Sequence, residues 1–350
     1  MYAPIRQIIP IAYIQRKRLL PVPGKVTVRQ GGKVIATDAV AEAILEPEHI
    51  LYDLARGLGV PEDEVEKYIQ RKPDMEVEEG DVLAGPVGIT RRVVRATRAG
   101  RVVLTAGGHL LLQVKSQVFT LRAGMSGVVT ELHPDRGVTI ETTGGLVQGV
   151  WGNGRLGVGQ LSIVAQSPDE ELTPARLDMS MRLAVLLGGA CSNPEVLRLA
   201  EELPLRGLIL ASMSAALIPQ ALKMRCPVIV LDGFGRLPMN PVAYQLLSTS
   251  ERNEVSINAE PWNHLTGNRP EVILSVPAGA RPLETPDVER FQKGDLVRVV
   301  RQPFHGKIGE LTSTPALSSL ANGIVAPAAW VAFEDHQKMI LPLTNLEVLK

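Results

Sequence analysis

The chain has 350 residues, of which 45% are hydrophobic and 21% charged, and 37 basic residues balance 37 acidic ones. At roughly 100–200 residues per domain, this length suggests two or three domains with cores of their own. The composition excludes disordered, collagen-like and disulfide-stapled proteins, which are respectively polar, glycine-periodic or rich in cysteine. A net charge of zero also removes any global attraction to nucleic acid, so nucleic-acid binding would need a local basic surface.

Cysteine usage and the lengths of apolar runs bear on the compartment. Two cysteines, Cys191 and Cys226, are too few for a disulfide framework and favour a reducing interior. The apolar stretch 8–14 contains a proline and is followed by basic residues, which is the wrong order for a signal peptide. The apolar run 207–219 is too short to cross a bilayer. We therefore expect a soluble cytoplasmic protein without membrane association.

The first predicted domain, residues 1–165, is rich in short β-branched or apolar runs separated by glycine. These runs lie at 26–28, 76–78, 100–104, 110–114, 127–130 and 138–141. The pattern is typical of a small barrel or sandwich. Between residues 47 and 73 apolar residues instead recur at helical spacing, where Gly59 can end one helix and Pro61 can open the next. We expect a helical hairpin inserted at 47–73.

Two fragments of this domain resemble each other, and both resemble a turn of the biotinyl and lipoyl domains, which are barrel-sandwich hybrids. They are 32–41 (GKVIATDAVA) and 80–84 (GDVLA), and 99–102 (AGRV) is similar to the return strand of that family. The resemblance covers about residues 22–114 and implies a barrel-sandwich-like fold. Those carriers attach their cofactor to an exposed hairpin lysine, and neither fragment continues into one. We expect no biotin, lipoyl group or other cofactor.

A glycine spacing in the same domain matches a nucleotide-binding pattern. Gly152, Gly154 and Gly157 spell G-x-G-x-x-G, which binds dinucleotides only where a strand enters it and a helix leaves it. The residues that follow, 158–165, read as a strand. We interpret the glycines as a turn between strands.

The second predicted domain, residues 178–280, alternates buried strands with helices. Apolar runs at 183–188, 208–211 and 227–231 predict strands covered on both faces. Helices are predicted after the N-cap Asn193, up to about Met224, and at 240–247; strands at 254–258 and 271–276 close the sheet. This alternation predicts a small, parallel, doubly wound α/β domain.

A sheet of this kind binds ligands at the carboxyl ends of its strands. The candidate ligand loops there hold Ser192, Asn193, Ser212, Ser214, Asp232, Gly233 and Gly235. Helix caps and an ordinary Asp-Gly turn explain the same residues equally well. Cys191 precedes a predicted helix, whose N-terminus can lower the pKa of a thiol, but no motif places a histidine beside it. The six histidines lack metal-binding spacing, so we expect no metal site, and the sequence leans against an enzyme.

The third predicted domain, residues 285–350, follows a proline-containing linker at 281–287. Its segment 291–311 (FQKGDLVRVVRQPFHGKIGEL) closely resembles a KOW motif. Alternating polar and apolar residues predict a half-buried strand, and glycines permit the tight reversal into the next one. Further strands are predicted at 330–333, 339–343 and 345–348, after a Ser/Ala-rich excursion at 312–327. The resemblance implies a small SH3-like β-barrel.

The KOW family occurs in bacterial transcription elongation and antitermination factors and in ribosomal proteins, where it contacts RNA or the surrounding machinery. The candidate RNA- or partner-binding residues are Lys293, Arg298, Arg301, Phe304, His305 and Lys307. This basic strip suits phosphates, but acidic neighbours oppose it and a single aromatic side chain stacks bases poorly. We expect a noncatalytic cytoplasmic adaptor whose tail docks on a larger assembly of protein or RNA. The alternative is a small-ligand-binding or enzymatic α/β domain, and the sequence leaves the oligomeric state open.

Overall fold

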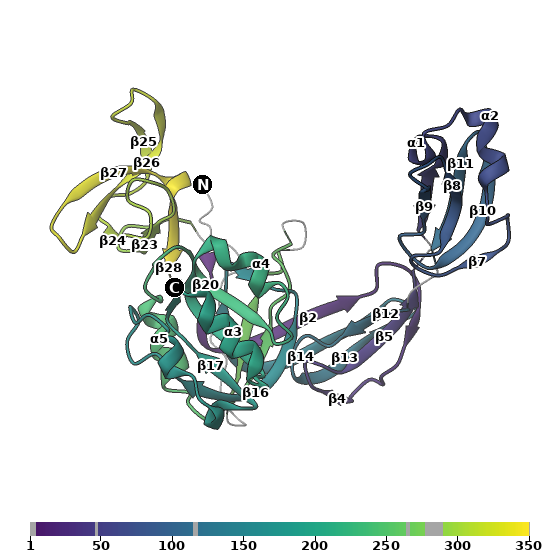
Figure 1. The fold of residues 1–350 in the computed structure, drawn as a ribbon. Coiled ribbons are helices and arrows are strands. Elements are labelled where there is room, and N and C mark those ends of the chain that lie inside the picture. Colours follow the sequence, from purple (N-terminus) through teal and green to yellow (C-terminus); the bar gives the residue numbers. More distant parts are fainter. Residues whose placement is uncertain (1–4, 46–47, 115–117, 264–266, 277–289, 350) are drawn as a thin grey trace.

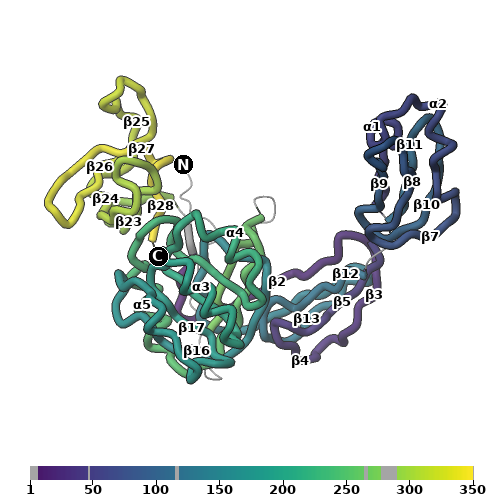
Figure 2. The backbone as a smooth tube through the Cα atoms, viewed as in Figure 1, coloured from purple at the N-terminus to yellow at the C-terminus, as the bar shows by residue number. Residues whose placement is uncertain are grey.

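The computed structural model describes residues 5–45, 48–114, 118–263, 267–276 and 290–349 (Figure 1). The described strands form five sheets, the largest of which has 12 strands and occupies the centre of the molecule. Smaller sheets on one side of it lead to a distal module, residues 48–114, and a C-terminal sheet lies on the other side (Figure 2). None of the described helices is long and apolar enough to span a membrane.

The central sheet is mixed. Its parallel part consists of β16 (Leu156–Ile163), β17 (Ala184–Leu187), β19 (Gly207–Met213) and β20 (Val228–Phe234), with β18 (Ala190–Cys191) beside β19. Its antiparallel part consists of β15 (Trp151–Gly152), β21 (Glu254–Asn258), β22 (Glu271–Ser275), β14 (Gly137–Gln148), β2 (Ile8–Leu19), β13 (Gly127–His133) and β4 (Lys33–Val34). The predicted strands of 178–280 are present, but the sheet is larger than predicted and is not purely parallel. The difference arises because β14 and β2, from the first predicted domain, extend the same sheet.

Helices cover both faces of the parallel part. α3 (Pro194–Glu202) and α4 (Ile218–Ala221) contribute to one hydrophobic core, and α5 (Pro241–Ser248) contributes to the other. Asn193 and Asn240 cap α3 and α5, each followed by a proline in the first turn. The helix predicted to reach Met224 is shorter than expected: a 3-10 turn (Ala215–Leu217) leads into the four residues of α4.

The glycine pattern at 152–157 forms a turn, as predicted. Gly154 has a φ of 81°, and β16 begins two residues later, so the chain leaves the glycines as a strand. At Gly157 a Cβ atom would lie 2.2 Å from the carbonyl oxygen of Arg206, so this position requires glycine for close backbone packing.

Strands β2 and β14 continue beyond the central sheet into a second core. They pair antiparallel from Ile8 with Val147 to Leu19 with Gly137. At the Leu19 end a three-stranded sheet covers them, formed by β12 (Val118–Arg122), β5 (Ala39–Ile44) and β3 (Lys25–Val26). The two layers enclose a core with members from both, including Ile14, Val40, Leu121 and Ile140. We call this part the middle sandwich.

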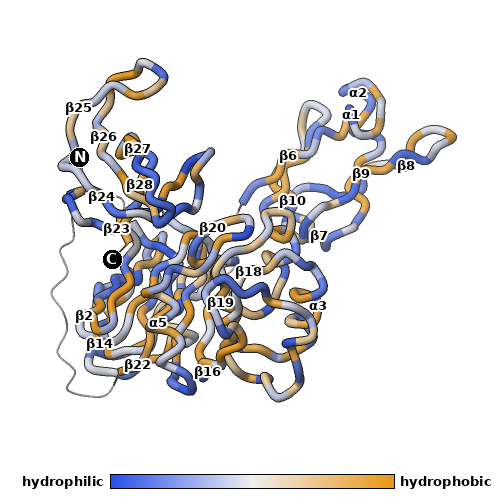
Figure 3. The backbone as a smooth tube through the Cα atoms, turned by 90° about the vertical axis from the view of Figure 1, so that its left-hand side faces the viewer, coloured by the Kyte–Doolittle hydropathy of each residue, from blue (hydrophilic) through white to orange (hydrophobic). Residues whose placement is uncertain are grey.

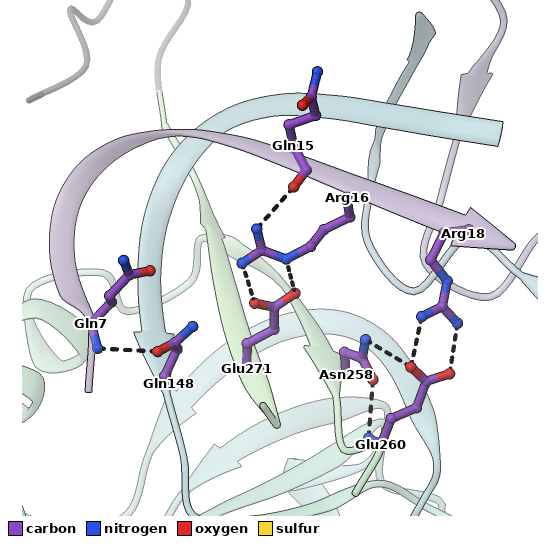
Figure 4. A network of polar contacts seen from close by, with 8 residues as sticks. All are labelled: Gln7, Gln15, Arg16, Arg18, Gln148, Asn258, Glu260 and Glu271. Carbon is purple, nitrogen blue, oxygen red and sulfur yellow. Dashed lines mark hydrogen bonds and ion pairs between the residues drawn. The ribbon is translucent and has the colours of Figure 1, made fainter. Parts of the chain in front are cut away.

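Two arginines of β2 fasten the middle sandwich to the central sheet (Figure 4). Arg16 donates from Nε and Nη2 to the carboxylate of Glu271, at 3.0 and 2.6 Å. Arg18 donates from both terminal nitrogens to Glu260, each at 2.6 Å. Partial burial raises the pKa of Glu260, but the hydrogen bonds from Arg18 outweigh it and hold that pKa below its usual value. The carboxylate therefore stays ionised at neutral pH.

The distal module is a small β-structure with a helical edge. Its four-stranded sheet contains β6 (His49–Asp53), β11 (His109–Val114), β10 (Gly100–Ala106) and β7 (Glu76–Val77), and β8 (Val82–Val87) pairs with β9 (Arg92–Arg95). The helices are α1 (Leu54–Leu58), α2 (Glu62–Val65) and a 3-10 turn (Glu66–Tyr68).

The predicted helical hairpin at 47–73 is only partly formed. The segment 49–53 is a strand, because it finds a complete antiparallel ladder along β11. The helix begins after Asp53, whose side chain accepts a hydrogen bond from the backbone N–H of Arg56, and it ends at Gly59 with a φ of 70°. Residues 46 and 47 lie outside the described residues.

Within the described residues, one turn occurs three times. In each case an aspartate carboxylate accepts a hydrogen bond from the backbone N–H three residues earlier, and the aspartate N–H donates back to the carbonyl of that residue. The pairs are Asp38 with Ile35, Asp81 with Glu78 and Asp295 with Gln292, at carboxylate distances of 2.9, 3.2 and 2.7 Å. The likeness between fragments 32–41 and 80–84 therefore reflects a shared turn that leads into a buried strand, and the 291–311 segment shares it.

The C-terminal part is a curled antiparallel half-barrel. It contains β23 (Leu296–Val299), β24 (Ile308–Leu311), β25 (Ala316–Ser319), β26 (Val325–Phe333), β27 (Lys338–Pro342) and β28 (Leu346–Leu349). A separate core fills it, including Phe291, Val297, Leu311 and Val331. β1 (Ile5–Arg6) joins its edge parallel to β28, which brings both ends of the chain to the same sheet. The predicted linker at 281–287 lies outside the described residues.

Candidate docking surface

Arg298, the central residue of the predicted basic strip, is buried. It lies on β23, is 3% exposed, and its Nη1 is 2.5 Å from Oδ1 of Asp232 on β20. The other carboxylate oxygen of Asp232 accepts a hydrogen bond from the backbone N–H of Asn240 at 2.9 Å. The structure therefore pairs one residue of the basic strip with one residue of the candidate ligand loops. Their ion pair fastens the half-barrel to the central sheet and leaves neither charge on the surface.

The remaining residues of the strip divide between surface and core. Lys293, Arg301, His305 and Lys307 are exposed, whereas Phe304 is half-buried and stacks on Phe333 with ring centroids 6.3 Å apart. Lys307 places its Nζ 5.4 Å from the centroid of that Phe333 ring and 3.0 Å from Oδ2 of Asp335. The hydrogen bond from Lys307 lowers the pKa of the Asp335 carboxyl. Phe304 therefore extends the core, and Lys307 already has an anionic partner.

Apart from Ser214, the polar side chains of the candidate ligand loops are engaged in local structure. Asn193 caps α3 through the N–H of Glu195, and Ser192 bonds to Glu171. Ser212 is fully buried, and its Oγ both donates to the carbonyl and accepts from the N–H of Leu237, at 2.9 and 3.0 Å. Ser214 precedes the 3-10 turn but makes no capping hydrogen bond with its side chain, and the positive φ angles of Gly233 and Gly235 suit a turn. These contacts agree with the capping and turn interpretation of the loops.

Other segments of the chain cover the same edge of the sheet. Ala190, on β18, exchanges backbone hydrogen bonds with Glu170 and Leu172 at 2.9 and 2.8 Å. Beside the end of β20, Gly306 of the half-barrel packs so closely that a Cβ there would lie 2.5 Å from a methyl carbon of Leu237. The carboxyl ends of these parallel strands are therefore partly occupied by the protein itself.

Two open grooves lie away from these loops. One, of about 520 Å³, lies between α2 and the turn at 105–108 of the distal module. The other, of about 400 Å³, lies between β4, β14 and β22. Neither is lined by a residue of the candidate ligand loops. Among the residues that the structure describes, no group of three or more His, Cys, Asp and Glu side chains is placed to hold a metal ion.

Cys191 does not have an activated thiol. It lies before α3, but burial raises its pKa to about 12, and burial likewise raises the pKa of Cys226 to about 12. We expect both thiols of the native protein to react with Ellman's reagent at pH 8 far more slowly than after unfolding in guanidinium chloride. Rapid reaction of one thiol in the native protein would contradict this placement.

The outer face of the half-barrel carries an apolar surface that the sequence did not single out. Cross-strand pairing aligns Leu296 with Glu310, Glu310 with Ala332, and Trp330 with Ile340. Leu296 is 39% exposed and Trp330 is 46% exposed. We define the docking face as Leu296, Glu310, Trp330, Lys338 and Ile340. Strand alternation places these residues on the same side as Arg298, so the docking face borders the contact with the central sheet.

An arm, residues 312–328, projects from the half-barrel beside this face (Figure 3). It consists of β25 and the beginning of β26, and no charged residue occurs between Glu310 and Glu334. Leu317, Ile324 and Val325 are 74%, 57% and 64% exposed. The predicted excursion is therefore an ordered β-ribbon with an apolar surface.

In comparisons with known proteins, no protein-family model and no curated protein matches the chain.

Proposed function

We propose that the chain is a noncatalytic cytoplasmic docking protein, and that its half-barrel is an SH3-like module of KOW type that attaches to a larger protein assembly. The exposed Trp330 of the docking face carries this proposal. Tryptophan side chains with apolar neighbours and a charged rim are typical of the energetic centres of protein interfaces. Here Ile340 lies opposite Trp330, and Lys338 lies opposite Ala332 in the next row of the face. Glu310 lies between Leu296 and Ala332 on the neighbouring strands and supplies the acidic group of the face.

Protein is favoured over RNA as the partner. Of the six residues considered for phosphate or base contacts, Arg298 is buried, Lys307 pairs with Asp335, and Phe304 packs in the core. Lys293, Arg301 and His305 remain, which is a small number of charges for a nucleic-acid site. The ligand-binding alternative is not favoured either, because Ser192, Asn193, Ser212 and Asp232 of its loops are all engaged in local contacts. In the proposal the barrel-sandwich-like part within residues 1–165 is a support that carries no cofactor.

The test compares partner retention by matched variants of the full-length protein. We expect wild-type protein isolated from its native cells to retain a protein partner. The Trp330→Ala variant should lose this partner, and so should the double variant Trp330→Ala with Leu296→Ser. An exposed interface tryptophan contributes at least about 2 kcal/mol, equivalent to a roughly thirtyfold weaker complex. Leu51→Ser serves as control, because Leu51 is 63% exposed on the distal module.

Equal retention by wild type and the Trp330→Ala variant would contradict the proposal. So would a partner lost only after RNase treatment or at moderately raised salt, since that outcome indicates RNA. In that case Arg301→Ala and Lys293→Ala, rather than Trp330→Ala, should weaken the complex.

A further inference from the structure

The arm carries an open strand edge without charged side chains. Among the described strands, β25 is the last of its sheet and pairs with β26 alone. Proteins usually blunt such edges with lysine, proline, bulges or a covering segment. The sequence of β25, Ala316–Ser319, has no charge and no proline, and its register with β26 is unbroken. Because an isolated two-stranded ribbon is only marginally stable, this edge is suited to pairing with a further strand.

The register identifies which backbone groups face the open edge. At the tip the N–H of Leu320 donates to the carbonyl of Ile324 at 2.9 Å, so these residues form a hydrogen-bonded pair. Hydrogen-bonded and non-hydrogen-bonded pairs alternate along an antiparallel ladder. Leu317 is therefore in a non-hydrogen-bonded pair with Pro327, which has no N–H to donate. By the same alternation the N–H and C=O groups of Leu317 and Ser319 point away from β26.

We propose that two copies of the chain associate by antiparallel pairing of β25 with β25 around a two-fold axis at Ser318. In this register Leu317 lies opposite the partner's Ser319 and Ser319 lies opposite the partner's Leu317. Both are hydrogen-bonded pairs, which satisfy all four outward-facing groups of each copy. Ser318 faces its own equivalent in a non-hydrogen-bonded pair, so the two ribbons form one continuous four-stranded sheet.

The charge pattern of the arm favours a second copy as the occupant. A strand with charged side chains would bring them beside Leu317 of β25, where the arm offers no counter-charge. A second arm is neutral and brings the same apolar side chains, and the net charge of zero adds no repulsion between copies. The docking face takes no part in this pairing. A result that contradicts the dimer therefore leaves the proposed partner complex untouched, and the reverse also holds.

Sedimentation equilibrium of the full-length protein tests the dimer. We expect a monomer–dimer equilibrium whose dissociation constant rises at least about tenfold in the Ser319→Pro variant, because two inter-chain hydrogen bonds are lost with the N–H. Ser319→Thr keeps the N–H and should leave the constant unchanged within about threefold. A wild-type protein that remains monomeric at all concentrations, or a dimer insensitive to Ser319→Pro, overturns the proposal.

Disulfide trapping tests the register separately and does not depend on how the proline variant folds. A cysteine in the Ser318→Cys variant lies opposite its own equivalent at a Cα separation of about 4.5 Å, within the range of a disulfide. The Leu317→Cys variant is the matched control, because its two thiols are offset along the strands. We expect mild oxidation to cross-link Ser318→Cys at least about tenfold faster than Leu317→Cys. Equal rates, or cross-linking of neither, overturn the proposed pairing.

Discussion

Replacing Arg298 by methionine is expected to lower the free energy of unfolding by about 3–5 kcal/mol. The side chains of Arg298 and Asp232 are 4% and 1% exposed, so the variant leaves a carboxylate buried without its counter-charge. The change should first loosen the half-barrel, because this pair joins β23 to β20. Urea unfolding followed by tryptophan fluorescence measures the loss of stability. Trp330 reports on the half-barrel, and Trp151 reports on the central sheet beside β20.

The matched control removes both charges at once. In the double variant Arg298→Met with Asp232→Leu no charge is left uncompensated, and we expect most of the lost stability to return. A double variant as unstable as Arg298→Met would show that the hydrogen bond from Asn240 to Asp232, rather than the ion pair, dominates. An unchanged unfolding midpoint in Arg298→Met would contradict the burial of this pair.

Replacing Arg16 by methionine is expected to lower the free energy of unfolding by about 3 kcal/mol. The reason is that Glu271 is only 3% exposed and would lose both hydrogen bonds from the guanidinium. The Arg16→Lys variant should retain only part of the wild-type stability, since a lysine cannot make the bidentate contact with the carboxylate. Hydrogen exchange at the ladder of β14 and β22 would report the loosening at the junction between the central sheet and the middle sandwich.

An exposed arginine provides the comparison for Arg16. Arg198 on α3 also contacts two carboxylates, those of Glu195 and Glu202, but its side chain is 54% exposed. Arg198→Met should change the unfolding free energy by less than about 1 kcal/mol. Similar losses in the two variants would indicate that burial of Glu271 is not the cause.

Local structure was predictable from the sequence where no distant strand competed with the local pattern. The Asn-Pro pairs at 193–194 and 240–241 mark two helix starts, and glycine-bounded apolar runs mark several strands of the first predicted domain, including β10, β11 and β14. Residues 49–53 show the limit of such reasoning: their apolar spacing suits a helix, but a partner strand 60 residues away supplies a full ladder. The extent of the central sheet was missed for the same reason, because β2 pairs with a strand more than 100 residues later.

The sequence could identify which residues have side chains suited to binding, but not which of them lie on the surface of the folded protein. Alternation along the segment predicted a half-buried strand, and the segment does form a strand, β23. Nothing local indicates that the side carrying Arg298 packs against β20, whose Asp232 is 66 residues earlier in the chain. The exposure of Trp330 likewise depends on which side of the curled sheet faces outward, and this follows only from the complete half-barrel.

The path of β1 and β2 has a mechanical consequence. One segment, residues 5–19, starts beside β28 in the half-barrel, crosses the central sheet and ends in the middle sandwich. β2 alone has 12 residues and spans about 40 Å. A pulling force between the half-barrel and the middle sandwich acts along this strand, so it loads the hydrogen bonds from Ile8 to Leu19 together in shear rather than opening them one by one. We therefore expect extension along β2 to meet more resistance than separation of β2 from β14 one residue pair at a time.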